Sequence, residues 1–175
     1  MIAYWLLPTA EASEKIAALI RELAAEFDAP IFDPHVTLYA GGDDVRIAEQ
    51  TVSTTGERSA PIILCARSIE HSDRFTKTLF IQLLPDNELK GLSAFVQSQA
   101  CAAEPYELNP HVSLLYARVT AAVREKTTQQ IAIPSAAITF DRIRAVRCAI
   151  PIKTRTDVEG WQTLAEAKLI AGAGS

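Results

Sequence analysis

Two of the three histidines in this 175-residue chain lie in almost identical settings. Around His35 the sequence reads PHVTL, and around His111 it reads PHVSL. Side chains alternate between the two faces of a strand, so each imidazole shares a face with the hydroxyl two residues later, His35 with Thr37 and His111 with Ser113. Each segment therefore predicts a strand with one apolar face for the core and one face that carries an imidazole and a hydroxyl.

A single histidine on an apolar strand is most often a structural residue. The same imidazole and hydroxyl placed twice favours a function, because burying polar groups costs free energy unless they find partners. An imidazole titrates near pH ~6.5 and can give or take a proton near neutrality. Hydrolysis of a cyclic phosphodiester needs a base for water, an acid for the leaving oxygen, and donors for the phosphate oxygens. Two imidazoles and two hydroxyls around one point would supply all of these.

Other chemistries fit the sequence less well. Neither strand carries an acidic residue or a second histidine at metal-ligand spacing, so we expect no metal and no other cofactor. A GxSxG nucleophile turn is missing from the sequence, and Gly41-Gly42 is a lone pair rather than a phosphate loop. Asp33 precedes His35 by two residues and could orient its ring, whereas Asn109 stands at the equivalent place before His111. His71 lacks a hydroxyl in this register and is predicted to lie in a surface turn.

Length and composition indicate one ordinary globular domain spanning residues 1–175, with 49% hydrophobic residues. The net charge of −4 argues against broad binding of long nucleic acid. No apolar run approaches the ~20 residues that cross a bilayer, so we expect no membrane partner. Three cysteines without a CxxC pair predict reduced thiols in a cytoplasm. The expectation is a cytoplasmic monomer that acts on a small phosphorylated ligand.

Hydrophobic spacing and turn residues predict an order of elements that is close to one pattern written twice. Helices are expected at about 9–27, 43–52, 86–101 and 120–130, the second of them ended by Gly56. Strands are expected at about 1–8, 33–39, 61–71, 78–84, 111–117, 137–150 and 161–169, with polar turns at 153–160 and a loop at 102–110. The fold class is therefore α+β, with a duplicated unit whose halves face each other.

The motifs PHVTL and PHVSLLYA resemble the paired HxTx and HxSx signatures of the two-histidine (2H) phosphoesterases. Within them, the chain is similar to the plant- and yeast-type cyclic nucleotide phosphodiesterases over most of its length. The subgroup features are the opening AYWLLP with Trp5, the Tyr116 that follows the second motif, and a W-x-T at Trp161.

The resemblance implies a bilobal α+β fold, in which two antiparallel sheets face a central cleft and helices lie outside. It also implies metal-free hydrolysis of ADP-ribose 1″,2″-cyclic phosphate to ADP-ribose 1″-phosphate, and of nucleoside 2′,3′-cyclic phosphates to 2′-phosphates. The implied roles are acid and base for His35 and His111, phosphate binding for Thr37 and Ser113, and borders of the nucleotide site for Tyr116 and Trp5. We expect His111 to be the base and His35 the acid.

Two of these residues have a second interpretation from strand alternation. Tyr116 would share the face of Leu114, away from Ser113, unless the strand ends or bulges near Leu115. Trp5 would lie in the core, or else at the rim of an adenine site.

Several further side chains near the motifs are less specific. Trp161 is expected to pack. Positive potential could come from four residues that solvated faces also explain, namely Arg67, Lys77, Arg144 and Arg147.

Two other functions are also compatible with the sequence. One is a nucleotide-binding module with little or no turnover, and the other is an RNA-end 2′,3′-cyclic phosphodiesterase or ligase relative. The acidic balance and short chain disfavour long RNA as the substrate.

Overall fold

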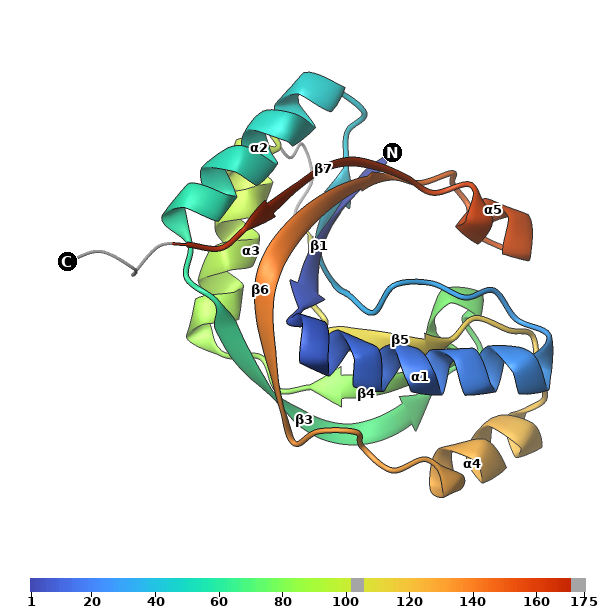
Figure 1. The fold of residues 1–175 in the computed structure, drawn as a ribbon. Coiled ribbons are helices and arrows are strands. Elements are labelled where there is room, and N and C mark those ends of the chain that lie inside the picture. Colours follow the sequence, from blue (N-terminus) through green and yellow to red (C-terminus); the bar gives the residue numbers. More distant parts are fainter. Residues whose placement is uncertain (102–105, 171–175) are drawn as a thin grey trace.

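The computed structural model describes residues 1–101 and 106–170, so the predicted loop at 102–110 lies partly outside the described residues. Its strands form one antiparallel, strongly curved sheet in the order β2-β1-β6-β3-β4-β5, with β7 paired to β6 (Figure 1). The strands are β1 (Ile2–Pro8), β2 (Val36–Gly41), β3 (Ile62–His71), β4 (Leu79–Leu83), β5 (His111–Leu115), β6 (Ala137–Arg147) and β7 (Gln162–Lys168). The predicted α+β class is confirmed.

Helices cover the curved sheet. They are α1 (Ala10–Phe27), α2 (Val45–Arg58), α3 (Asn87–Gln99), α4 (Ala121–Gln130) and α5 (Arg155–Glu159), with a 3-10 turn η1 at Phe75–Lys77. In Figure 1, α2 and α3 lie side by side, with α2 against β6 and β7 and α3 against β2. Helix α1 packs against β5 and β1, and α4 against β3.

Capping side chains explain where four of the helices begin, and at the start of α2 the Asp44 carboxylate accepts the backbone N–H groups of Arg46 and Ile47. The Asp86 carboxylate accepts the backbone N–H of Leu89 at the start of α3, and the Thr120 hydroxyl does the same for Val123 in α4. Helix α5 lies in the segment that was predicted to be polar and rich in turns. It is short, and a reciprocal capping box between Thr154 and Asp157 fixes it.

Gly56 does not end α2 as predicted, because the helix continues to Arg58. A Cβ at Gly56 would lie 2.8 Å from the Lys168 carbonyl oxygen and 2.8 Å from the Ala167 Cβ. The Gly56 carbonyl also accepts the N–H of Ile170 at 3.0 Å. The glycine is therefore needed for the close approach of the end of β7 to the helix, at a helix-propensity cost of about 1 kcal/mol relative to alanine.

The two faces of β1 belong to different clusters. Tyr4 and Leu6 join the main core, which also contains the apolar stripe of α1. Trp5 points the opposite way, into a smaller cluster with Leu7 and Val146 that Trp161 covers. This alternation separates a purely structural face from a second face on which the histidine site is built.

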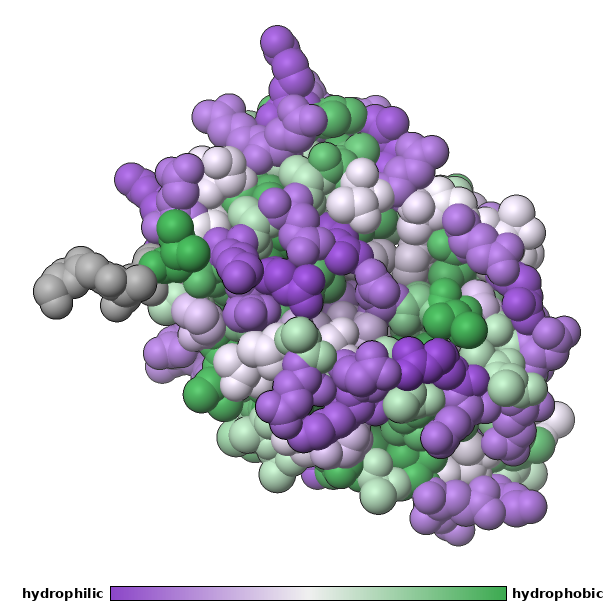
Figure 2. All heavy atoms as spheres, viewed as in Figure 1, coloured by the Kyte–Doolittle hydropathy of each residue, from purple (hydrophilic) through white to green (hydrophobic). Residues whose placement is uncertain are grey.

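The surface seen in Figure 2 is mostly hydrophilic, with apolar side chains in small groups. Such scattered apolar residues are normal for a globular protein. Among the described helices, none combines the length and the apolar character needed to cross a bilayer.

Candidate active site

Main-chain carbonyl groups hold both motif histidines in the same way. His35 Nδ1 lies 2.7 Å from the Asp33 carbonyl oxygen, and His111 Nδ1 lies 2.7 Å from the Asn109 carbonyl oxygen. A carbonyl oxygen only accepts hydrogen bonds, so Nδ1 carries the proton in both rings and Nε2 is left free. Each ring therefore has its second nitrogen available for proton transfer.

The Asp33 carboxylate does not orient His35 as the sequence had suggested. It accepts a hydrogen bond from Arg144 Nη1 at 2.5 Å instead, and Arg144 Nε also bonds Glu166 at 2.6 Å. Because a main-chain carbonyl holds each imidazole, we expect the difference between Asp33 and Asn109 to matter little for ring orientation.

The histidines occupy matching places in two strand pairs. His111 is the first residue of β5, whereas His35 immediately precedes β2 rather than lying on it as predicted. Thr37 lies opposite Trp5 on β1. Ser113 lies opposite Phe80 on β4. An aromatic residue of the neighbouring strand thus flanks the hydroxyl of each motif.

These pairs extend into rows across the sheet. The first row continues from Thr37 and Trp5 to Arg144 on β6. The second continues from Ser113 and Phe80 to Glu70 on β3. Each row places a charged side chain one strand beyond the aromatic residue.

Burial controls the charge of both imidazoles. The His35 side chain is buried at 7% exposure, and His111 is half-buried. Desolvation lowers the pKa of each ring to about 4, although the carbonyl hydrogen bonds act in the opposite direction. The charge of His111 also lowers the pKa of His35, so the two rings lie within electrostatic range of each other.

Aromatic rings connect the two histidine segments. The rings of Trp5 and His35 stack with centroids 3.8 Å apart. The Trp161 ring lies edge-on to His35 at 6.1 Å and to Tyr116 at 6.0 Å. Phe32 stacks on Tyr116 at 4.0 Å. Trp161 packs as predicted, but it packs between the two motifs.

Tyr116 escapes strict alternation because β5 ends at Leu115. Burial raises the pKa of the phenol, and the Ser113 side chain acts in the opposite direction. The Ser113 Oγ donates to the Thr76 carbonyl oxygen at 2.9 Å. Tyr116 is thus close enough to influence Ser113, which strict alternation did not predict, and its place at a nucleotide site stays a prediction.

Sequence reasoning missed several neighbours of the site. Phe32 stands three residues before His35, an aromatic position that the pattern of the motif did not single out. Phe80 approaches the His111 ring edge-on at 5.5 Å, and only the pairing of β4 with β5 reveals it. His71 ends β3 as an exposed residue, in agreement with its predicted surface position.

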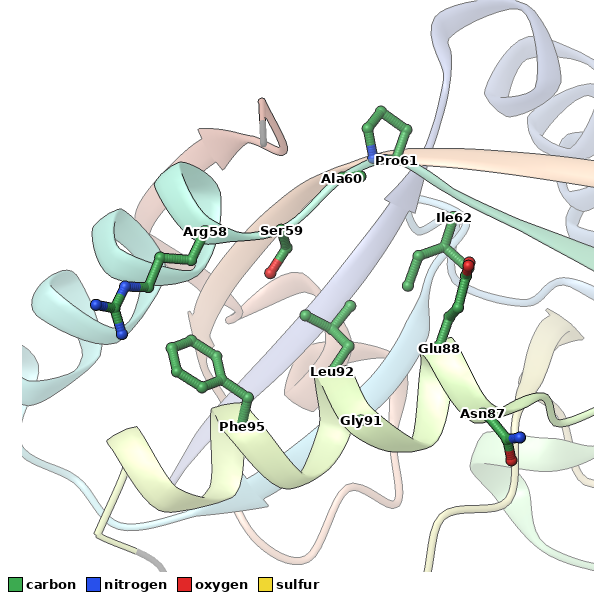
Figure 3. Close-up of a pocket in the computed structure, with 10 residues that line it drawn as sticks. All are labelled: Arg58, Ser59, Ala60, Pro61, Ile62, Asn87, Glu88, Gly91, Leu92 and Phe95. Atoms are coloured by element: carbon green, nitrogen blue, oxygen red, sulfur yellow. The ribbon is translucent and has the colours of Figure 1, made fainter. Parts of the chain in front are cut away.

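A separate cavity of about 480 Å³ lies between the end of α2 and helix α3. Its lining is mostly apolar, and Figure 3 shows Leu92, Phe95 and Ile62 facing this hollow from α3 and β3. It contains neither motif histidine and neither motif hydroxyl. This cavity is therefore separate from the paired histidine motifs, and its charged lining residues are Arg58 and Glu88.

Within residues 1–101 and 106–170, no three His, Cys, Asp or Glu side chains gather as a metal-ligand set. All three cysteines are free thiols, and burial raises the pKa of Cys148 to about 11.

Several solved structures have the same fold. Crystal structures of Escherichia coli LigT, in apo form and with 3′-AMP, each match with a TM-score of 0.60 and cover 96% of both chains, at 18% and 17% identity. The structure of TT0787 from Thermus thermophilus matches with a TM-score of 0.59 at 13% identity, covering 96% of this chain and 97% of that one. The fold and the paired histidine motifs define a two-histidine phosphoesterase.

Sequence comparison identifies the family. A curated relative, the cyclic phosphodiesterase of Arabidopsis thaliana, is 23% identical over 172 residues, which is 94% of this chain and 93% of the relative. The model of the cyclic phosphodiesterase-like protein family matches residues 1–169. The chain belongs to this family, and it is an enzyme of the cyclic phosphodiesterase class.

Proposed function

We propose that this enzyme hydrolyses the cyclic phosphodiester of small nucleotides without a metal ion. The proposed substrates are ADP-ribose 1″,2″-cyclic phosphate, opened to ADP-ribose 1″-phosphate, and nucleoside 2′,3′-cyclic phosphates, opened to 2′-phosphates. The observation that carries the proposal is the pair of imidazoles with carbonyl-bound Nδ1 and free Nε2. Support also comes from the Arabidopsis relative, named a cyclic phosphodiesterase, and from the E. coli LigT structure with 3′-AMP.

In the proposed reaction the two rings exchange one proton each with the reacting atoms. His111 Nε2 takes a proton from water, and the water oxygen forms a bond to phosphorus. The bond from phosphorus to the ring oxygen breaks, and protonated His35 Nε2 gives its proton to that oxygen. One ring must be neutral and the other charged at the start, so the substrate anion must raise the low pKa of His35 when it binds.

The hydroxyls of Thr37 and Ser113 are proposed to donate to the non-bridging phosphate oxygens. Ser113 must exchange its present bond to the Thr76 carbonyl for a bond to phosphate. Tyr116 and Trp5 are proposed to border the nucleotide, although each is only 4% exposed here. Their contact with ligand therefore requires part of the aromatic cluster to open.

The two lobes of the proposed fold are the strand pairs β1–β2 and β4–β5 with their helices, within a single domain. The matching rows from Thr37 to Trp5 and from Ser113 to Phe80 support a duplicated unit. A cleft between the lobes would let the phosphate meet one motif from each side. All proposed residues come from one chain, so we propose that the monomer is active.

Turnover assays in excess EDTA test the proposal. ADP-ribose 1″,2″-cyclic phosphate, each 2′,3′-cyclic mononucleotide and a short RNA with a 2′,3′-cyclic end would be compared by kcat/KM. The expected result is undiminished hydrolysis of the small nucleotides, with the phosphate left on the 2′ position of the mononucleotides. Binding without product would favour the nucleotide-binding module, and preference for the RNA would favour end processing. Loss of activity in EDTA that added metal restores would refute the metal-free mechanism.

A further inference from the structure

Each histidine has one cationic side chain close enough to influence its charge, and the two cations differ in their partners. Arg144 influences His35, and Lys77 influences His111. Arg144 forms ion pairs with Asp33 and Glu166. Within the described residues, the ion pairs of the molecule do not include Lys77. The positive charge on the His111 side is therefore the less neutralised of the two.

Lys77 is held over the second histidine segment by an aromatic ring. Its Nζ lies 4.1 Å from the centroid of the Phe80 ring, in cation–π contact. The same Phe80 ring meets the His111 ring edge-on at 5.5 Å and lies opposite Ser113 across the strands. The ammonium therefore lies on the face that carries the proposed acid-base and phosphate-binding groups.

The backbone next to Lys77 also belongs to this region. The neighbouring Thr76 carbonyl accepts the Ser113 hydroxyl, which ties η1 to the second motif. Lys77 is half-buried, and its desolvation lowers the pKa of its ammonium. A partly desolvated cation without an ion-pair partner gains more from an anion than a fully hydrated one does.

We propose that Lys77 is a further substrate-binding residue whose ammonium contacts the phosphate of the substrate on the Ser113 side. This inference rests on the proposed cyclic phosphodiesterase function and adds a charged group to its two hydroxyl donors. A phosphodiester carries one negative charge, and attack of water adds electron density to the equatorial oxygens. Lys77 then stabilises the bound anion and the more highly charged transition state.

The same placement gives the two histidines different surroundings. A cation beside His111 opposes a second positive charge there, so His111 stays neutral and acts as the base. The charged groups that act on Lys77 itself are Glu70, which raises its pKa, and Arg74, which lowers it. Beside His35, the carboxylate of Asp33 acts in favour of the protonated ring, whereas His111 and Arg144 act against it.

Lys77→Met tests the proposal, because methionine keeps a long apolar side chain over Phe80 and removes the charge. Lys77→Arg is the control that retains the positive charge. Arg74→Met is the control that removes an exposed cation from the N-cap position of η1. Inorganic phosphate and a nucleoside 2′-monophosphate would be titrated by calorimetry, and kcat and KM measured with a 2′,3′-cyclic nucleotide. Melting temperatures would establish that each variant is folded.

The expected result is about 10- to 100-fold weaker phosphate and 2′-monophosphate binding in Lys77→Met, the range of one charge-assisted hydrogen bond. Lys77→Arg should recover most of this loss, and Arg74→Met should stay within about threefold of wild type. Equal anion affinity in wild type and Lys77→Met would overturn the inference. The calorimetric measurement does not require turnover. If the wild type hydrolysed no cyclic phosphate, the proposed function would be refuted, and the calorimetry would still decide whether Lys77 binds phosphate.

Discussion

Trp5 lies flat against His35, with their ring centroids 3.8 Å apart and their planes 13° from parallel. The indole also meets Trp161 edge-on at 5.0 Å, and Trp161 lies edge-on to His35, so two tryptophan rings pack against this imidazole. We predict that Trp5→Leu lowers kcat by about tenfold or more, since loss of ring orientation affects the chemical step, and also raises KM, because the indole borders the proposed nucleotide site. Trp5→Phe, which keeps an aromatic face, should retain more activity.

A different kinetic result would contradict the role that we assign to Trp5. If Trp5→Leu raised KM and left kcat unaltered, the indole would be a nucleotide-stacking residue and not a support for His35. Thermal melts of both variants control for damage to the smaller apolar cluster.

Removal of either free Nε2 should stop acid-base catalysis. We predict that His35→Asn and His111→Asn each lower kcat by roughly 10²- to 10⁴-fold, the range for one general acid or base. Asparagine keeps a polar side chain in the buried position, so circular dichroism should be unchanged. His71→Asn is the matched control at an exposed histidine, and its kcat should equal that of wild type. Near-full activity in either motif variant would remove that residue from the mechanism.

The rate should respond to pH on the acidic side of neutrality. Burial lowers the pKa of both His35 and His111 to about 4, so both rings are neutral in the free enzyme at pH 7. The productive form has one protonated ring, and its population falls roughly tenfold per pH unit above these pKa values. We predict that kcat/KM declines from pH 5 to pH 8, while kcat declines later because bound phosphate raises the pKa of the acid. A kcat/KM independent of pH over this range would contradict the assignment.

The side chains two residues before each histidine should matter little for ring orientation. We predict that Asp33→Ala and Asn109→Ala each keep kcat within about fivefold of wild type, because the carbonyl groups that hold Nδ1 remain. The measurement is kcat of each variant, compared with that of His35→Asn. NMR detection of the Nδ1 protons would report ring orientation directly. A hundredfold loss in Asp33→Ala would mean that its carboxylate acts on His35 after all.

The sequence motifs were sufficient to predict the two imidazoles and the two hydroxyls as the candidate site. The signal was the repetition of one face of a strand, which depends only on side-chain alternation. Alternation failed at Tyr116 because it holds only while the strand continues, and β5 ends at Leu115. Alternation also led to the prediction that His35 lies on the strand, whereas β2 begins one residue later, at Val36.

Contacts between distant segments were beyond the reach of local patterns. Trp161 and Phe80 come to the histidines through strand pairing and through the packing of the C-terminal part of the chain. Gly56 gave a helix-ending signal, and its real cause is a tertiary contact with Lys168. The positions that local rules misread are those where another part of the chain is the deciding neighbour.

Strand β3 lies between β6 and β4 and joins the two parts of the curved sheet (Figure 1). Residues from Ile62 to Cys65 pair with β6, and those from Ala66 to His71 pair with β4. The segment at Cys65 and Ala66 therefore fixes the span between the imidazole next to β2 and the imidazole on β5. Under the proposed function, we expect a change in curvature there to alter the distance between the two imidazoles, and with it the size of the cyclic ester that the site accepts.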